Sequence, residues 1–155
     1  MKIEIQQQEV AEFSQEWFDF KDGVKLRIAD TRKPAFNRAL ELNNIQAEQE
    51  LQGMKQVTDD SAVKSSLAFN RSVSHLITGW NGIETKDNPF EYSPKNAELL
   101  CTSTKYSNEI VVFAITKASE LKRIAMKAVE DEVGKSLSTM SKETSSGRQK
   151  SRRHL

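Results

Sequence analysis

Apolar and polar residues alternate with a period of two near the start of the chain, in residues 16–20 (EWFDF) and 24–29 (VKLRIA). This alternation is typical of half-buried β-strands, and residues 21–23 (KDG) between the two runs supply a tight turn. The pattern predicts a β-hairpin over about residues 13–30. The second run places three aliphatic side chains on one face: Val24, Leu26 and Ile28. Because a lone hairpin is marginally stable in water, this face must pack on helices or on another copy.

From Pro34 onward the apolar residues recur at steps of three and four, which is the period of an α-helix. Proline suits the first turn of a helix, so a first helix is predicted from Pro34 to near Gly53. A second helix is predicted from Ser61 to about Thr78, with Trp80 completing its apolar stripe.

Residues 79–93 contain two glycines and a proline and predict a structured loop or a short hairpin. The Ser-Pro pair at 93–94 marks a helix start, because serine can cap the helix and proline fits its first position. A short helix to about Cys101 should follow, and a longer one over about residues 107–133.

The predicted fold class is α+β and mainly helical, with one N-terminal hairpin followed by about four helices. We assign residues 1–134 to a single domain, whose helical part covers about 34–134, because a chain of this length supports one core. Residues 135–155 carry six Lys or Arg and one Glu, whereas the other 134 residues carry 17 basic and 21 acidic side chains. With few aliphatic residues, 135–155 are predicted to form a disordered basic tail.

Groups that could support catalysis are scarce, and we predict that the protein is not an enzyme. The sequence contains no phosphate-binding, dinucleotide or metalloprotease motif, and we expect no cofactor, metal or catalytic residue. The single cysteine, Cys101, is predicted to be buried and structural, and His75 to be solvated or locally hydrogen-bonded. With no apolar run long enough for a membrane span and no disulfide pair, a cytoplasmic location is expected.

The central segment from His75 to Leu100 carries the most specific pattern in the chain. It combines an aliphatic pair, a Gly-Trp-x-Gly step, a polar turn, a Pro-Phe pair and a helix start of the form Ser-x-x-Asn. These positions are Leu76, Ile77, Gly79, Trp80, Gly82, Pro89, Phe90, Ser93 and Asn96. This pattern, with the hairpin before it, resembles that of bacteriophage tail assembly chaperones over roughly residues 13–125. The chain departs from it at Asn81 and Ile83 and in the long polar turn at 84–88.

The resemblance implies a late viral protein of the host cytoplasm that binds and solubilises the tape measure protein and helps recruit tail tube subunits. In that family a longer product is often made by ribosomal frameshifting. An apolar groove on a small helical protein suits a helical client, and self-association is left open. The candidate protein-binding residues are Trp80, Phe90, Val24, Leu26, Ile28, Ile110 and Phe113. Trp80 has two readings, since an aromatic residue at this spacing packs in a core or anchors an interface.

Two other functions fit the same composition. A structural virion protein, such as a tail terminator or connector, would remain in the finished particle, whereas a chaperone would leave. A small nucleic-acid-binding regulator would use the basic tail, but that tail has no aromatic residue to stack on bases, and nucleic acid is the least favoured partner.

Overall fold

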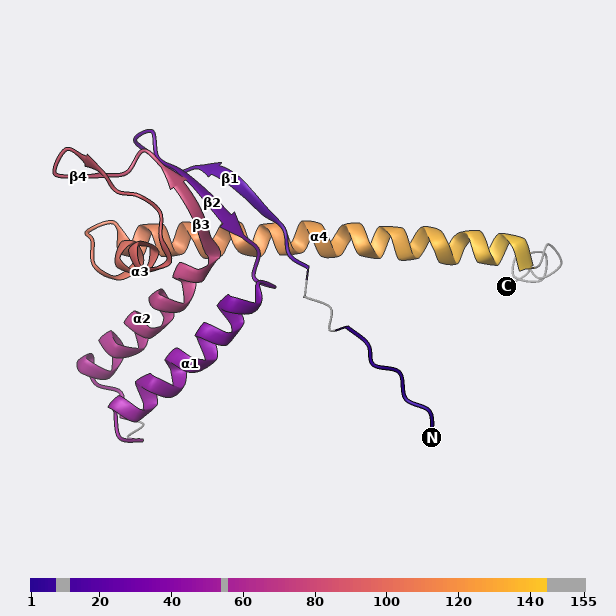
Figure 1. Ribbon diagram of the computed structural model, residues 1–155, viewed down its shortest axis with the longest axis horizontal. Coiled ribbons are helices and arrows are strands. Elements are labelled where there is room, and N and C mark those ends of the chain that lie inside the picture. Colours follow the sequence, from indigo (N-terminus) through magenta and orange to yellow (C-terminus); the bar gives the residue numbers. More distant parts are fainter. Residues whose placement is uncertain (8–11, 54–55, 145–155) are drawn as a thin grey trace. The chain divides into compact units, whose positions relative to one another are not determined.

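The computed structural model describes residues 1–7, 12–53 and 56–144, with side chains up to residue 137. The chain forms two compact units, Met1–Lys122 and Arg123–Leu155, and the division falls inside the last helix (Figure 1). The α+β class predicted from the sequence is confirmed, because within the described residues an N-terminal β-hairpin is followed by four α-helices.

The first unit contains a three-stranded antiparallel sheet in the order β1-β2-β3. Strands β1 (Gln15–Asp19) and β2 (Lys25–Ala29) form the predicted hairpin. At its turn, the Val24 amide donates to the Lys21 carbonyl over 2.9 Å, and Asp22 and Gly23 both have positive φ. That conformation suits an Asp-Gly pair, and it explains why the local sequence sufficed to predict the turn.

The third strand of the sheet was not predicted. β3 (Ile77–Asn81) pairs with β2, and Leu26 lies opposite Trp80. The second helix, α2 (Asp59–Val73), is followed by a 3-10 turn (Ser74–Leu76), so its predicted end near Thr78 was wrong. The apolar residues that extend the helical stripe belong to a strand whose partner lies about fifty residues earlier in the chain.

The helices begin where local signals place them. α1 (Pro34–Glu50) starts with proline in its first turn, and α3 (Pro94–Thr102) is capped by the Ser93 hydroxyl, which accepts from the Asn96 amide over 3.0 Å. Between β3 and α3, strands β4 (Glu84–Thr85) and β5 (Asn88–Pro89) form a short hairpin. Of the two structures predicted for this segment, a structured loop or a short hairpin, the second is present.

The last helix, α4 (Ser107–Thr144), is longer than predicted. It continues through Gly134 and includes residues 135–144, the first part of the segment assigned to the tail from sequence. A glycine inside a helix costs only about 1 kcal/mol relative to alanine, which does not end a helix by itself. Residues 145–155 of the predicted tail lie outside the described residues.

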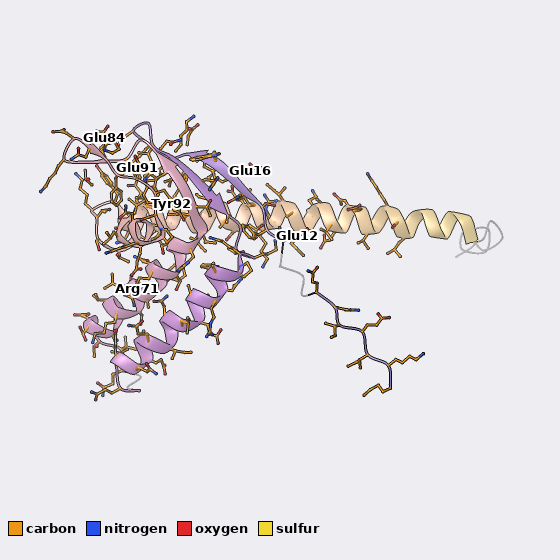
Figure 2. All side chains as sticks on the ribbon, in the orientation of Figure 1. Glu12, Glu16, Arg71, Glu84, Glu91 and Tyr92 are labelled. Carbon is orange, nitrogen blue, oxygen red and sulfur yellow. The ribbon has the colours of Figure 1, made fainter. Side chains whose placement is uncertain are left out.

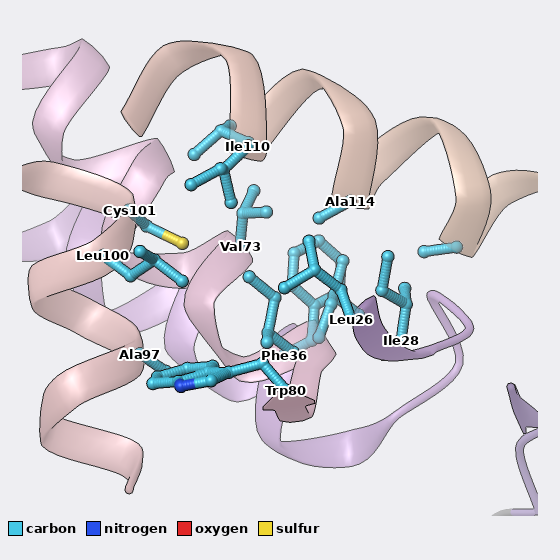
Figure 3. Close-up of a cluster of buried hydrophobic side chains, with 14 residues drawn as sticks. Leu26, Ile28, Phe36, Val73, Trp80, Ala97, Leu100, Cys101, Ile110 and Ala114 are labelled. Atoms are coloured by element: carbon cyan, nitrogen blue, oxygen red, sulfur yellow. The ribbon is translucent and has the colours of Figure 1, made fainter. Parts of the chain in front are cut away.

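The core of the first unit lies between the sheet, α3 and the first turns of α4. Figure 3 shows Leu26 and Ile28 of β2 within this cluster, with Ile110 and Ala114 contributed by α4. The apolar face of the hairpin therefore packs on helices of its own chain, which was one of the two arrangements expected. Among the residues that the structure describes, no helix combines the length and apolarity of a membrane span.

Candidate functional site

A groove of about 420 Å³ lies in the first unit, where three segments distant in sequence meet. One is the hairpin turn after β1, the second is the connection from β3 to β5, and the third leads from α3 into α4. Figure 2 shows Glu84 on the β4–β5 hairpin and Tyr92 on the chain that leads to α3. The residues that line the groove are Phe20, Lys21, Asp22, Val24, Gly82, Ile83, Glu84, Thr85, Phe90, Leu100, Thr104, Lys105, Tyr106 and Ile110.

Apolar side chains dominate this lining. Ile110 and Leu100 are buried, each 4% exposed, whereas Val24, Ile83 and Phe90 are only partly buried. An apolar partner that covers these partly buried side chains removes their apolar surface from water, which favours binding. The groove therefore has the chemistry of a site for apolar side chains.

The rim of the groove is polar and ordered by Lys21. Its Nζ donates to Oε2 of Glu109 over 2.6 Å and lies 4.6 Å from the ring centre of Tyr106. The hydrogen bond to Glu109 raises the pKa of Lys21, and the lysine stays charged near neutral pH. Lys105 Nζ also lies 5.0 Å from the ring centre of Tyr106, so two cations contact this ring.

Trp80 supports the wall of the groove from behind. Its Nε1 donates to the carbonyl of Phe90 over 2.6 Å, and its ring stacks on the Phe90 ring with centroids 5.6 Å apart. The Tyr92 ring meets it edge-on at 5.1 Å. Trp80 is 7% exposed, and of its two readings the core one is supported.

The second glycine of the Gly-Trp-x-Gly step has a steric role at the edge of the groove. Gly82 has φ of +86°, and a Cβ built there would lie 2.7 Å from the carbonyl oxygen of Gly23. A side chain at this position would clash with backbone, and the required φ is also one that glycine adopts readily. Gly82 thus lets the β3–β4 connection pass close to the turn of the first hairpin.

The structure brings together some of the seven candidate binding residues and separates others. Val24, Phe90 and Ile110 line the groove, and Phe113 packs beside it on Phe20 with ring centroids 5.1 Å apart. Leu26 and Ile28 are 0% exposed. Their assignment to a binding surface was wrong, because the helices of the first unit already cover that face of the hairpin.

Sequence reasoning missed Ile83 and Tyr106 as groove residues. Both lie in connections between elements, where no periodic pattern marks an apolar side chain. Trp17 of β1 is 48% exposed. The Arg27 guanidinium lies 5.7 Å from its ring centre, and Arg27 Nε donates to the Thr78 hydroxyl over 2.9 Å. Trp17 therefore occupies the solvent face of the sheet.

The titratable side chains in the described part of the chain form no cluster of three or more that could hold a metal ion. His75 is exposed, as expected, and its carbonyl accepts a hydrogen bond from Lys33 Nζ over 2.7 Å. Partial desolvation of the imidazole lowers the pKa of His75, and the charge of Lys33 lowers it further.

Cys101 is buried in the core, as expected, and burial raises the pKa of its thiol to about 12. We expect the native protein to react very slowly with a thiol-specific disulfide reagent at pH 7–8, because the thiolate is the reacting form. Denatured protein should react completely within the same assay. Rapid reaction of the native protein would show that the thiol is accessible and would contradict this burial.

Comparison with known proteins returned one family. A family model described as "YdaY prophage protein" matches residues 31–135, which include α1 to α3, β3 and most of α4. No curated protein matches the chain, and no solved structure matches it.

Proposed function

The chain belongs to the YdaY prophage protein family, and we propose that it acts during virus assembly as a non-enzymatic tail assembly chaperone. A phage origin follows from the family. The more specific role rests on the resemblance of residues 75–100 to tail assembly chaperones and on the groove that those residues help to build. In this role the protein binds the tape measure protein in the host cytoplasm, keeps it soluble, and helps to recruit tail tube subunits.

The apolar groove is the structural observation that carries this proposal. A tape measure protein is expected to be long and helical with exposed apolar stripes, and such stripes self-associate when they are not covered. An amphipathic helix binds by inserting side chains from one face into an apolar groove. Ile83 and Phe90 offer partly buried apolar surface for such a contact, and the charged rim at Lys21 and Lys105 fits the polar flanks of a helix.

Co-expression with the tape measure protein of the same virus tests the proposal. We expect this protein to raise the soluble yield of the tape measure protein, and the two should co-purify in moderate salt, because an apolar contact is only weakly screened. Ile83→Asp should reduce the affinity by about tenfold to a hundredfold, since burying one large aliphatic side chain contributes about 1.5–3 kcal/mol.

Val63→Asp provides a matched control. Val63 is an apolar residue of α2, 57% exposed and not part of the groove, so its change to aspartate should leave binding unaltered. Val63→Asp should keep the melting temperature close to that of the unaltered protein, and Ile83→Asp, whose side chain packs partly against the core, should remain folded at the temperature of the binding assay. Equal solubility of the tape measure protein with and without this partner, and no complex at any salt concentration, would refute the chaperone role. Recovery of the protein in purified virions would favour a structural tail component instead.

A further inference from the structure

One edge of the three-stranded sheet presents backbone hydrogen-bonding groups that β2 does not use. Asp30 donates its amide to the Ser14 carbonyl, and Phe20 donates to the Val24 carbonyl, each over 2.9 Å. In an antiparallel pair, hydrogen-bonded and non-hydrogen-bonded positions alternate. The amides and carbonyls of Glu16 and Phe18 therefore face β2, and those of Gln15, Trp17 and Asp19 face away from it.

In the part of the chain that the structure describes, β1 pairs with β2 alone. The outward edge of this five-residue strand thus presents the backbone amides and carbonyls of three residues. Edges of this kind accept an added strand. Trp17 lies in the centre of the same strand and is 48% exposed, and its ring lies over Arg27 of β2 and close to Gly79 of β3.

The segment Met1–Gln7 has the sequence pattern of a strand. Lys2, Glu4 and Gln6 alternate with Ile3 and Ile5. The two isoleucine side chains are 77% and 97% exposed, and no strand is formed within residues 1–7. Alternating β-branched residues favour a half-buried strand. This segment therefore has the sequence of a β-strand but is not paired with another strand.

We propose that residues 2–6 of one copy of this protein pair with the outward edge of β1 in a second copy, and that the exchange is reciprocal. The occupant is a second copy because the chain by itself leaves the segment out of the sheet and leaves the β1 edge open. Two such exchanges close a symmetric dimer in which each copy gives one strand and accepts one. This dimer does not depend on the chaperone function.

Two measurements on the full chain test the dimer. Sedimentation or light scattering should give about twice the 17.6 kDa mass of one chain. Hydrogen exchange followed by NMR should show that the amides of Gln15, Trp17 and Asp19 exchange about tenfold or more slowly in the dimer than in dilute monomer. The amides of Glu16 and Phe18 serve as internal references, because they bond to β2 in both states.

A variant with neighbouring prolines, Glu4→Pro with Ile5→Pro, should be monomeric and should lose the protection at Gln15, Trp17 and Asp19. Two adjacent prolines are needed because only alternate amides of the added strand face β1, and one of the two prolines then removes such a donor. A control with Glu4→Thr and Ile5→Val keeps the strand propensity and should remain dimeric.

Each other result overturns the proposal. A monomer whose outward β1 amides are nevertheless protected would place the segment on its own chain. A dimer without protection at these amides would place the contact elsewhere. A protein that is monomeric and unprotected at every concentration would have no added strand at all.

Discussion

Replacing Trp80 with alanine is expected to lower the free energy of unfolding by about 3–5 kcal/mol, the usual cost of truncating a buried tryptophan. The indole is 7% exposed, stacks on Phe90 and donates a hydrogen bond to its carbonyl. Truncation would leave a cavity behind the groove and an unpaired carbonyl. Chemical denaturation followed by circular dichroism measures the change.

Trp17→Ala is the matched control for this experiment. Trp17 is 48% exposed, and its main specific contact is the stacking of Arg27, so the loss should be about 1 kcal/mol or less. If Trp80→Ala instead melts like the unaltered protein but no longer binds the client, Trp80 is an interface residue rather than part of the core.

Replacing Asp30 with alanine is expected to cost about 3–5 kcal/mol, because it removes a buried carboxylate that accepts hydrogen bonds from two backbone amides and from the Arg32 side chain. Asp30 is 0% exposed. Its Oδ2 accepts from the Ser14 amide over 2.6 Å and from Arg32 Nη2 over 2.8 Å, and its Oδ1 accepts from the Arg32 amide over 2.7 Å. The carboxylate thus ties the start of β1 to the end of β2, and alanine would leave these donors without their acceptor.

The ion pair also predicts how stability depends on pH. Burial opposes the charged form of Asp30, but the hydrogen bonds from Arg32 and Ser14 outweigh it, and the pKa is lowered from its ordinary value of 3.8. A carboxylate with a lowered folded pKa stabilises the fold above its unfolded pKa, and this contribution is lost as the pH falls through the folded pKa. The stability difference between the unaltered protein and Asp30→Asn should therefore be constant above about pH 5 and shrink below about pH 4. A difference that is unchanged between pH 7 and pH 3 would show that the charge of Asp30 contributes nothing.

The two halves of the Gly-Trp-x-Gly pattern illustrate how the site relates to sequence. The pattern can be recognised in the sequence, but the structural roles of its residues depend on contacts with residues outside the pattern. Gly82 is required because the carbonyl of Gly23 approaches it, and Trp80 is buried because Phe90 and Tyr92 cover it. Both explanations involve residues from other elements, so the pattern alone left Trp80 with two readings.

Local interactions determined the parts of the fold that could be predicted from sequence. The Asp22-Gly23 turn depends on backbone preferences of those two residues, the Ser93 cap on a hydrogen bond three residues away, and the start of α1 on the fixed φ of Pro34. Each of these signals acts within a few residues. The sequence by itself therefore determined the first hairpin, the helix starts and the mainly helical α+β class.

Tertiary structure decided the elements whose partners are distant in the chain. Ile77–Asn81 form a strand because β2 offers its edge, and Arg27 reaches Thr78 across a separation of 51 residues. Helices of the first unit bury Leu26 and Ile28, while Val24 is left at a groove made by three separate segments. The apolar character of a residue favours its burial at any position in the chain. Whether it is buried depends on which other helices and strands pack against it. For this reason the sequence identified apolar candidates, and only the packed structure separated core from groove.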